Sequence, residues 1–188
     1  MKYDIEKIKS LYDAEPESMK FLFFWGHNNR YNNINKTCLS QWYPCEFEID
    51  GETYNCAEQY MMAQKAVVFK DSRTLEKILE SSDPKQIKAL GRQVKNFNDG
   101  VWFQYAKNIV IRGNYAKFSQ NPELKEFLLK TAPNILVEAS PYDKIWGIGL
   151  SERDHSQIIC NPHNWLGTNL LGCALTEVRD MLKAEIED

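Results

Sequence analysis

Residues 53–69 read TYNCAEQYMMAQKAVVF. This stretch is long enough for a helix, polar residues bracket it, and apolar residues occupy nearly every side of it. Such a pattern is typical of a helix that is buried all round rather than one that lies on the surface. We therefore expect a central helix here, with the rest of the chain packed around it.

Two charged residues, Glu58 and Lys65, interrupt this apolar helix. They are seven positions apart, almost two helical turns, so both point to the same side at roughly 10 Å along the axis. A carboxylate and an amine on one side of a mostly apolar helix must be paired, be solvated in a cleft, or have shifted pKa values. A cleft would make both residues catalytic.

Each charge also has a structural interpretation. Asn55 followed by Glu58 resembles a capping box, in which the acid turns back onto the start of the helix. Lys65 alone fits a surface amine whose stem crosses an apolar face. The two charges together favour a catalytic pair.

Length and composition set the class of protein. The chain has 188 residues, which fits one domain with a full core. Its formal charge of -3 excludes the positive field of a dedicated DNA-coating protein, but leaves nucleic acid open as a local substrate. The sequence shows no apolar signal-peptide core and no run of about eighteen apolar residues, the length of a membrane helix. We expect a soluble, cytoplasmic protein with no membrane partner, and the oligomeric state stays open.

The cysteines and histidines do not form a recognisable metal motif. Five cysteines without a CxxC pair favour reduced thiols in a reducing compartment. His155, Cys160 and His163 lack a convincing fourth ligand, whereas structural zinc sites normally show four in paired spacings. We expect neither a metal nor another cofactor.

The remaining patterns predict a mainly α (α+β) fold, a compact single domain with a few short antiparallel strands. Residues 1–20 form an N-terminal helical extension, and residues 21–188 form the main domain. The aromatic run 21–25 predicts a strand, and Asp50-Gly51 predicts a hairpin that leads into the central helix. Further helices are expected at 75–79, 84–90, 101–118, 122–131 and 164–182, and a further strand at 135–139.

Two further features suggest ligand contacts. Arg112 lies beside the apolar stripe of its helix and is either a surface residue or a clamp for a phosphate or carboxylate. Asp143 precedes Trp146, Gly147 and Gly149, so this turn offers a closely approachable backbone and a ring for stacking. An ordinary turn fits the same pattern.

An ordered series of motifs over about residues 21–183 resembles the NADAR or YbiA-like family. The matching residues are Asp50-Gly51, Glu58, Tyr60, Ala63-Gln64-Lys65, Gly91-Arg92, Trp102, Arg112, Lys117-Phe118, Leu136-Val137-Glu138, Asp143, Trp146-Gly147, Gly149, Asn169, Leu171-Gly172, Leu175 and Val178-Arg179. The resemblance implies an N-glycosidase with a mainly helical fold. Members of the family remove ADP-ribose from guanine in nucleic acid, or act on ribosylamino-pyrimidine phosphates of the riboflavin pathway.

The resemblance also implies the site. The catalytic residues are expected to be Glu58, Lys65 and Asp143. The substrate-binding residues are expected to be Trp25, Gly26, Arg92, Trp102, Arg112, Trp146, Gly147 and Asn169. The implied partners are an ADP-ribose or ribose-phosphate substrate and ADP-ribosylated DNA.

Four positions depart from the family pattern. Gln59 stands where a histidine is common, Gln41-Trp42 where Asn-Phe is usual, and Ile148 where the YbiA-like branch has an aspartate. The lost aspartate favours removal of ADP-ribose from guanine over cleavage of the pyrimidine ribosides. A non-catalytic reader of ADP-ribose or nucleotides is a third interpretation, but a pure reader would not need both Glu58 and Lys65.

Overall fold

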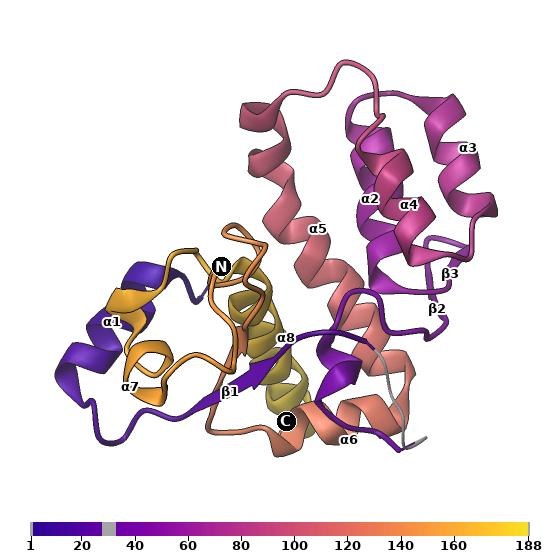
Figure 1. The fold of residues 1–188 in the computed structure, drawn as a ribbon. Helices are drawn as coiled ribbons and strands as arrows, with labels where there is room; N and C mark the ends of the chain where they lie inside the picture. Colours follow the sequence, from indigo (N-terminus) through magenta and orange to yellow (C-terminus); the bar gives the residue numbers. More distant parts are fainter. Residues whose placement is uncertain (1, 28–32, 188) are drawn as a thin grey trace. The chain divides into compact units, whose positions relative to one another are not determined.

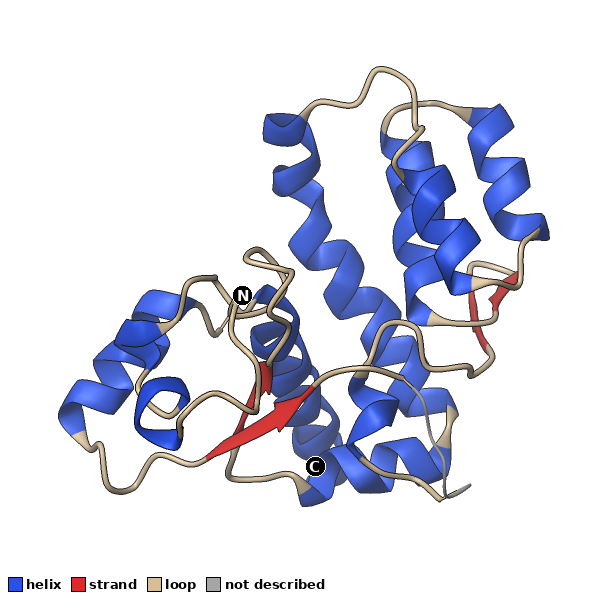
Figure 2. Cartoon of the chain, viewed as in Figure 1, coloured by secondary structure: helices blue, strands red, loops and turns tan. Residues whose placement is uncertain are grey.

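The computed structural model describes residues 2–27 and 33–187 (Figure 1). The chain divides into two compact units, each with its own internal contacts. Met1–Ser40 and Glu123–Asp188 together make the first, called here the terminal unit, and Gln41–Pro122 makes the second, the central unit. Helices dominate both units (Figure 2).

The central unit consists of one hairpin and four helices. Its elements are β2 (Phe47–Ile49), β3 (Glu52–Tyr54), α2 (Ala57–Val68), α3 (Ser72–Glu80), α4 (Pro84–Gly91) and α5 (Asp99–Gln120). Helix α2 contacts α3, α4, α5 and β3, and every residue from Ala57 to Ala63 is buried. The expected buried helix is therefore confirmed, although it begins at Ala57, because Thr53 and Tyr54 still pair with β2. Its contacts are with elements of the central unit, so it is the centre of that unit rather than of the whole chain.

Two features explain how α2 is placed. Strands β2 and β3 pair antiparallel, and Asp50 and Gly51 between them have φ values of 56° and 81°, as a two-residue turn of type I′ requires. Glycine then lets two neighbouring helices approach α2. A Cβ atom on Gly91 of α4 would lie 2.0 Å from the sulfur of Met62, and one on Gly113 of α5 would lie 2.5 Å from the Tyr60 ring.

The terminal unit is built from both ends of the chain. Its elements are α1 (Ile5–Ala14), β1 (Phe21–Phe24), the 3-10 helix η1 (Lys36–Leu39), α6 (Pro122–Lys130), β4 (Ile135–Glu138), α7 (Ser156–Ile159), the 3-10 helix η2 (Pro162–Asn164) and α8 (Leu170–Glu187). Helix α8 packs on β4, and the core contains Ile8, Ile135, Val137, Ala139, Ile148, Trp165 and Cys173. Because Ile8 is fully buried there, α1 contributes to this core.

The mainly helical fold class with few short strands is confirmed. The expectation that the strands pair antiparallel is correct for β2 and β3 but wrong for β1 and β4, which pair parallel from Phe21↔Ile135 to Phe24↔Glu138. A parallel pair requires a long crossover, and the chain between β1 and β4 includes the whole central unit.

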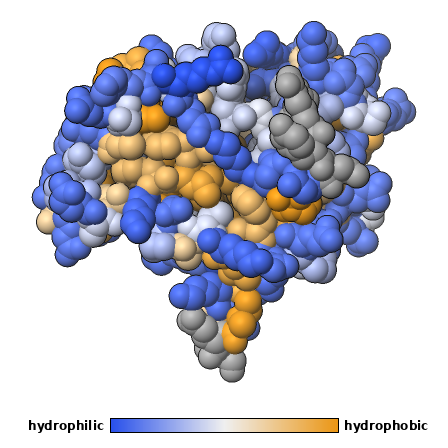
Figure 3. Space-filling model, turned by 60° about the horizontal axis from the view of Figure 1, so that its bottom comes forward, coloured by the Kyte–Doolittle hydropathy of each residue, from blue (hydrophilic) through white to orange (hydrophobic). Residues whose placement is uncertain are grey.

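The surface carries both polar and apolar areas. On the face drawn in Figure 3, apolar areas lie among hydrophilic residues. No helix within residues 2–27 and 33–187 is both long and apolar enough to cross a membrane.

Candidate active site

The first turn of α2 holds Glu58 without a capping box. The N-cap residue is Cys56, which makes no side-chain cap bond. The backbone N–H of Glu58 donates to the Gln41 carbonyl at 2.9 Å, and that of Asn55 donates to Gln59 Oε1 at 2.8 Å. The capping-box interpretation of Asn55 and Glu58 is therefore wrong, since both backbone groups have other partners. The Glu58 side chain itself is only 5% exposed.

Gln41 fixes the backbone that meets Glu58. Its side-chain oxygen accepts a hydrogen bond from Asn114 Nδ2 at 2.8 Å, and its Nε2 lies 3.9 Å from the sulfur of Met61. Asn114 is fully buried on α5 and also donates to the carbonyl of Val110 at 2.9 Å. The position of Glu58 thus depends on a buried amide pair. The sequence signal for this pair is an asparagine inside the apolar pattern of residues 101–118, which was not among the predicted site residues.

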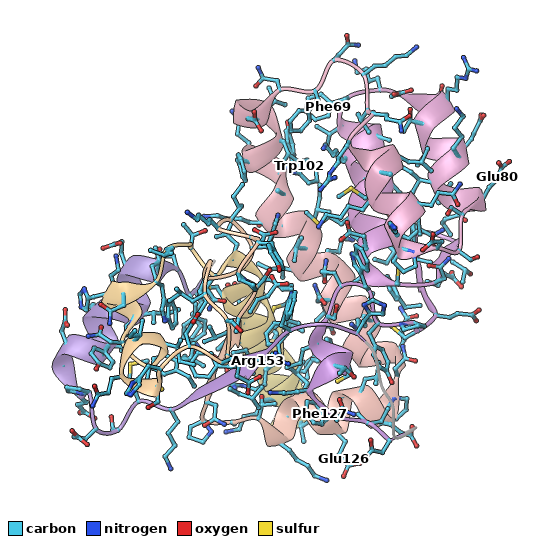
Figure 4. The ribbon with its side chains drawn as sticks, in the orientation of Figure 1. Phe69, Glu80, Trp102, Glu126, Phe127 and Arg153 are labelled. Carbon is cyan, nitrogen blue, oxygen red and sulfur yellow. The ribbon has the colours of Figure 1, made fainter. Side chains whose placement is uncertain are left out.

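Lys65, in the last turn of α2, lies among aromatic rings. Its Nζ is 3.9 Å from the ring centroid of Phe97 and 5.9 Å from that of Trp102. Phe97 in turn makes an edge contact with Phe69, with centroids 5.3 Å apart. Figure 4 labels Trp102 on α5 and Phe69 just after α2. Cation–π attraction holds a lysine in such a place, while the rings remove part of its water.

The charge state of Lys65 follows from this environment. Burial lowers the pKa of its amine, and the nearby positive charge of Arg92 lowers it further. The carboxylates of Asp99 and Glu58 act in the opposite direction and raise it. Glu58, Arg92 and Asp99 therefore each lie within electrostatic range of Lys65, and the net effect leaves the pKa of its amine below the ordinary value.

Arg112 occupies an exposed position near the hairpin turn. Its guanidinium donates to Asp50 Oδ1 at 2.7 Å, and both side chains are more than half exposed. The structure thus gives Arg112 a carboxylate partner within the chain. Its role as a clamp for substrate stays a prediction.

Three predicted residues of the terminal unit, Asp143, Trp146 and Gly147, belong to one turn. Asp143 Oδ1 accepts hydrogen bonds from the N–H groups of Ile145 (2.9 Å) and Trp146 (2.8 Å), which makes an Asx turn. Gly147 is required, because a Cβ atom there would lie 2.8 Å from the carbonyl oxygen of Glu138. Asp143 thus shapes the turn with one oxygen, and its catalytic role stays untested.

Asn169 serves the fold at the start of α8. It is fully buried with φ of 53°, accepts from the Glu138 N–H at 2.9 Å and donates to the Leu136 carbonyl at 2.9 Å. Its amide therefore satisfies two backbone groups of β4. At the end of β1, Trp25 is 51% exposed, and Gly26 has φ of 80°, with no atom of the described residues within 4 Å of a Cβ position.

The predicted site residues are divided between the two units. Glu58, Arg92 and Trp102 lie near Lys65 in the central unit. The terminal unit holds Trp25, Gly26, Asp143, Trp146, Gly147 and Asn169. Phe97 and Asp99 were missed, because neither belongs to a motif. Phe97 lies just before α5 and Asp99 is its first residue, and both become relevant only through their effect on Lys65. No group of three or more His, Cys, Asp or Glu side chains that could hold a metal occurs in the described part of the chain.

Comparison with known families gives a match that covers most of the chain. The family model of the NADAR domain matches residues 23–183. The chain belongs to the NADAR domain family. The resemblance inferred from the sequence motifs is thereby confirmed.

Relatives of this NADAR chain share much of its length. N-glycosidase R617 of Acanthamoeba polyphaga mimivirus is 45% identical over 170 residues, which cover 87% of this chain and 97% of the relative. N-glycosidase YbiA of Escherichia coli (strain K12) is 33% identical over 138 residues, or 73% of this chain and 76% of the relative. The NMR structure of the E. coli protein YbiA is similar, with a TM-score of 0.70 at 27% identity, covering 90% of this chain and 88% of that chain.

Two departures from the NADAR pattern have structural roles. Gln59 is 2% exposed, and its Nε2 donates to the carbonyls of Ile78 (3.0 Å), Leu79 (3.2 Å) and Ser81 (3.0 Å), which ties α2 to the end of α3. Ile148 is fully buried in the core of the terminal unit. An ionised aspartate at position 148 would lose its water there.

Proposed function

We propose that this NADAR-domain protein is an N-glycosidase, which hydrolyses the bond between the C1 carbon of a ribose and a nitrogen of a base. The observation that carries the proposal is the amine of Lys65, 3.9 Å from the Phe97 ring centroid, with its pKa lowered by burial. The names of relatives that align over most of their length support the same reaction class.

Lys65 acts as the nucleophile. A lowered pKa increases the fraction of neutral amine at physiological pH, and a neutral amine can attack C1. The bond between the amine and C1 forms as the bond between C1 and the base breaks, and the base leaves with a proton. The sugar ring then opens to an imine, and water adds to that imine, which releases the sugar and restores the amine.

Glu58 serves these steps as the proton carrier and as a negative charge. Its carboxylate acts on Lys65 through space, since it raises the pKa of that amine. A carboxylate stabilises the positive charge that develops at C1 as the base leaves. The rings of Phe97 and Trp102 exclude water from the amine and offer faces for a base, while Arg92 supplies charge for a phosphate.

The proposed substrate is ADP-ribose attached to guanine in nucleic acid or in a nucleotide. Its support is the apolar environment of position 148, where the YbiA-like branch has an aspartate and this chain places Ile148 in its core. This chain lacks that acid at position 148, which favours the ADP-ribose substrate over the pyrimidine riboside. Cleavage of ribosylamino-pyrimidine phosphates, or binding without cleavage, are the competing outcomes of the test.

The test compares substrates and traps the intermediate. The protein is incubated with ADP-ribosylated guanine DNA and, separately, with the pyrimidine riboside phosphate, and released sugar is measured. We expect release from the guanine substrate. Release of sugar from the pyrimidine riboside alone would overturn the proposed substrate. Release of sugar from neither substrate would favour a protein that binds without cleaving.

Borohydride added during turnover reduces an imine to a stable adduct. We expect a mass increase on Lys65 that is absent from Lys65→Arg. Lys77→Ala, at an exposed position on α3, is the matched control and should retain both turnover and the adduct. An active Lys65→Ala would exclude covalent catalysis.

A further inference from the structure

The terminal unit contains a cavity of about 440 Å³ to which the proposed chemistry of Lys65 assigns no role. Residues that line it include Trp25, Ala139, Tyr142, Ser151, Glu152 and Arg153. Trp25 and Ala139 are the first residues after β1 and β4, and Phe24 pairs with Glu138 at the end of the two parallel strands. The cavity therefore lies at the carboxyl edge of a parallel strand pair, where α/β proteins commonly bind ligands.

Two exposed aromatic rings border the cavity. Trp25 is 51% exposed and Tyr142 is 85% exposed, and their ring centroids are 5.9 Å apart with an angle of 50° between the planes. Large aromatic side chains left this exposed and close together offer faces on which a planar ring stacks.

The charges at the cavity favour an anion. Lys36 Nζ lies 2.6 Å from both carboxylate oxygens of Glu152, which neutralises that side chain. Asp154, just beyond the lining, accepts a hydrogen bond from the Ser151 N–H at 2.7 Å and closes the turn that carries Arg153. Within the described residues the Arg153 guanidinium has no carboxylate partner (labelled in Figure 4), so it is the uncompensated charge of the lining. A planar guanidinium in that state matches a phosphate.

We propose that this cavity binds a purine nucleotide, with the base stacked on Trp25 and Tyr142 and a phosphate held by Arg153. The volume fits such a ligand, since sites for small molecules and cofactors commonly measure about 300–1,000 Å³. The inference goes beyond the proposed function and does not depend on it. Binding itself requires none of the chemistry of Lys65.

The test measures equilibrium binding of AMP, adenosine and ribose 5-phosphate to the full chain by titration calorimetry. We expect AMP to bind more tightly than either fragment, and Trp25→Ala to weaken AMP binding by about tenfold or more, the scale of a lost stacking contact. Arg153→Ala should weaken AMP binding and leave adenosine binding unchanged. Arg73→Ala, at an exposed position on α3, is the matched control and should bind as the unmodified protein does.

Two further measurements separate this proposal from the proposed reaction. Lys65→Ala should retain AMP binding even though its turnover is lost, and Trp25→Phe should recover part of the affinity lost in Trp25→Ala. Absence of AMP binding to the unmodified protein would overturn the nucleotide site. So would Trp25→Ala and Arg153→Ala variants that bind AMP as tightly as the unmodified protein does. If AMP binds with this dependence on Trp25 and Arg153 but no substrate releases sugar, the nucleotide site is supported and the N-glycosidase proposal is not. If sugar is released but AMP does not bind, only the N-glycosidase proposal is supported.

Discussion

Replacing Glu58 by glutamine removes one negative charge from the first turn of α2 and changes the shape of the side chain very little. The side chain is 5% exposed, so a larger substitution would disturb packing, whereas glutamine has almost the same volume. A negative charge near a helix N-terminus stabilises a protein by about 0.3–1 kcal/mol. We therefore expect the free energy of unfolding to fall by no more than about 1 kcal/mol, because no capping box is lost.

The effect on turnover should be much larger. Loss of a general acid–base group lowers the rate by about a hundredfold or more, which corresponds to roughly 2.7 kcal/mol of transition-state stabilisation. The variant should also change the pH profile. Glu58 raises the pKa of Lys65, so removing its charge lowers that pKa, and the rise of activity with deprotonation of the amine should move to lower pH.

Both quantities are measured on one preparation, with turnover followed across the pH range and unfolding followed in urea. Glu80→Gln, at the exposed end of α3 (Figure 4), is the matched control and should change neither. A variant that retains turnover but loses stability would refute the reasoning, because it would give Glu58 a structural role only. An unshifted pH profile in an impaired variant would refute the coupling to Lys65.

Trp146→Ala should weaken ligand binding by about 1–3 kcal/mol through lost stacking, measured by titration calorimetry, and unchanged affinity would make its ring part of the protein core. Gly113→Ala places a methyl group 2.5 Å from the ring of Tyr60, which is 1% exposed, so the free energy of unfolding in urea should fall by about 1–3 kcal/mol. Gly91→Ala should be less harmful, because its nearest contact is the sulfur of the flexible Met62 side chain; equal losses at the two glycines would contradict this reasoning.

The parts of the fold that the sequence predicts are those set by local patterns. The apolar run at 53–69 predicts α2, and Asp50-Gly51 predicts the hairpin because both positions need positive φ. The parallel pairing of β1 with β4 has no local signal, since the strands are far apart in the chain and the central unit lies between them in sequence. Pairing across such a separation is decided by tertiary packing.

The same distinction applies to the candidate site. Glu58 and Lys65 stand out because charges in an apolar helix are unusual. Phe97 lies just before α5 and Asp99 begins it, and both become relevant only through their effect on Lys65. Asn169 carries a family motif, yet its side chain bonds both ways to the backbone of β4. A motif residue can therefore belong to the fold as much as to the reaction.

The environment of Lys65 bears on why a lysine is found there at all. Among the described residues Lys65 makes no ion pair. Its ammonium is attracted to the rings of Phe97 and Trp102, yet burial still lowers the pKa of the amine. An apolar side chain of similar length would occupy the same position without any loss of hydration. The lysine therefore reduces the stability that α2 could have, and N-glycosidase chemistry gives a reason for that loss, since a nucleophilic amine must be partly neutral when the substrate binds.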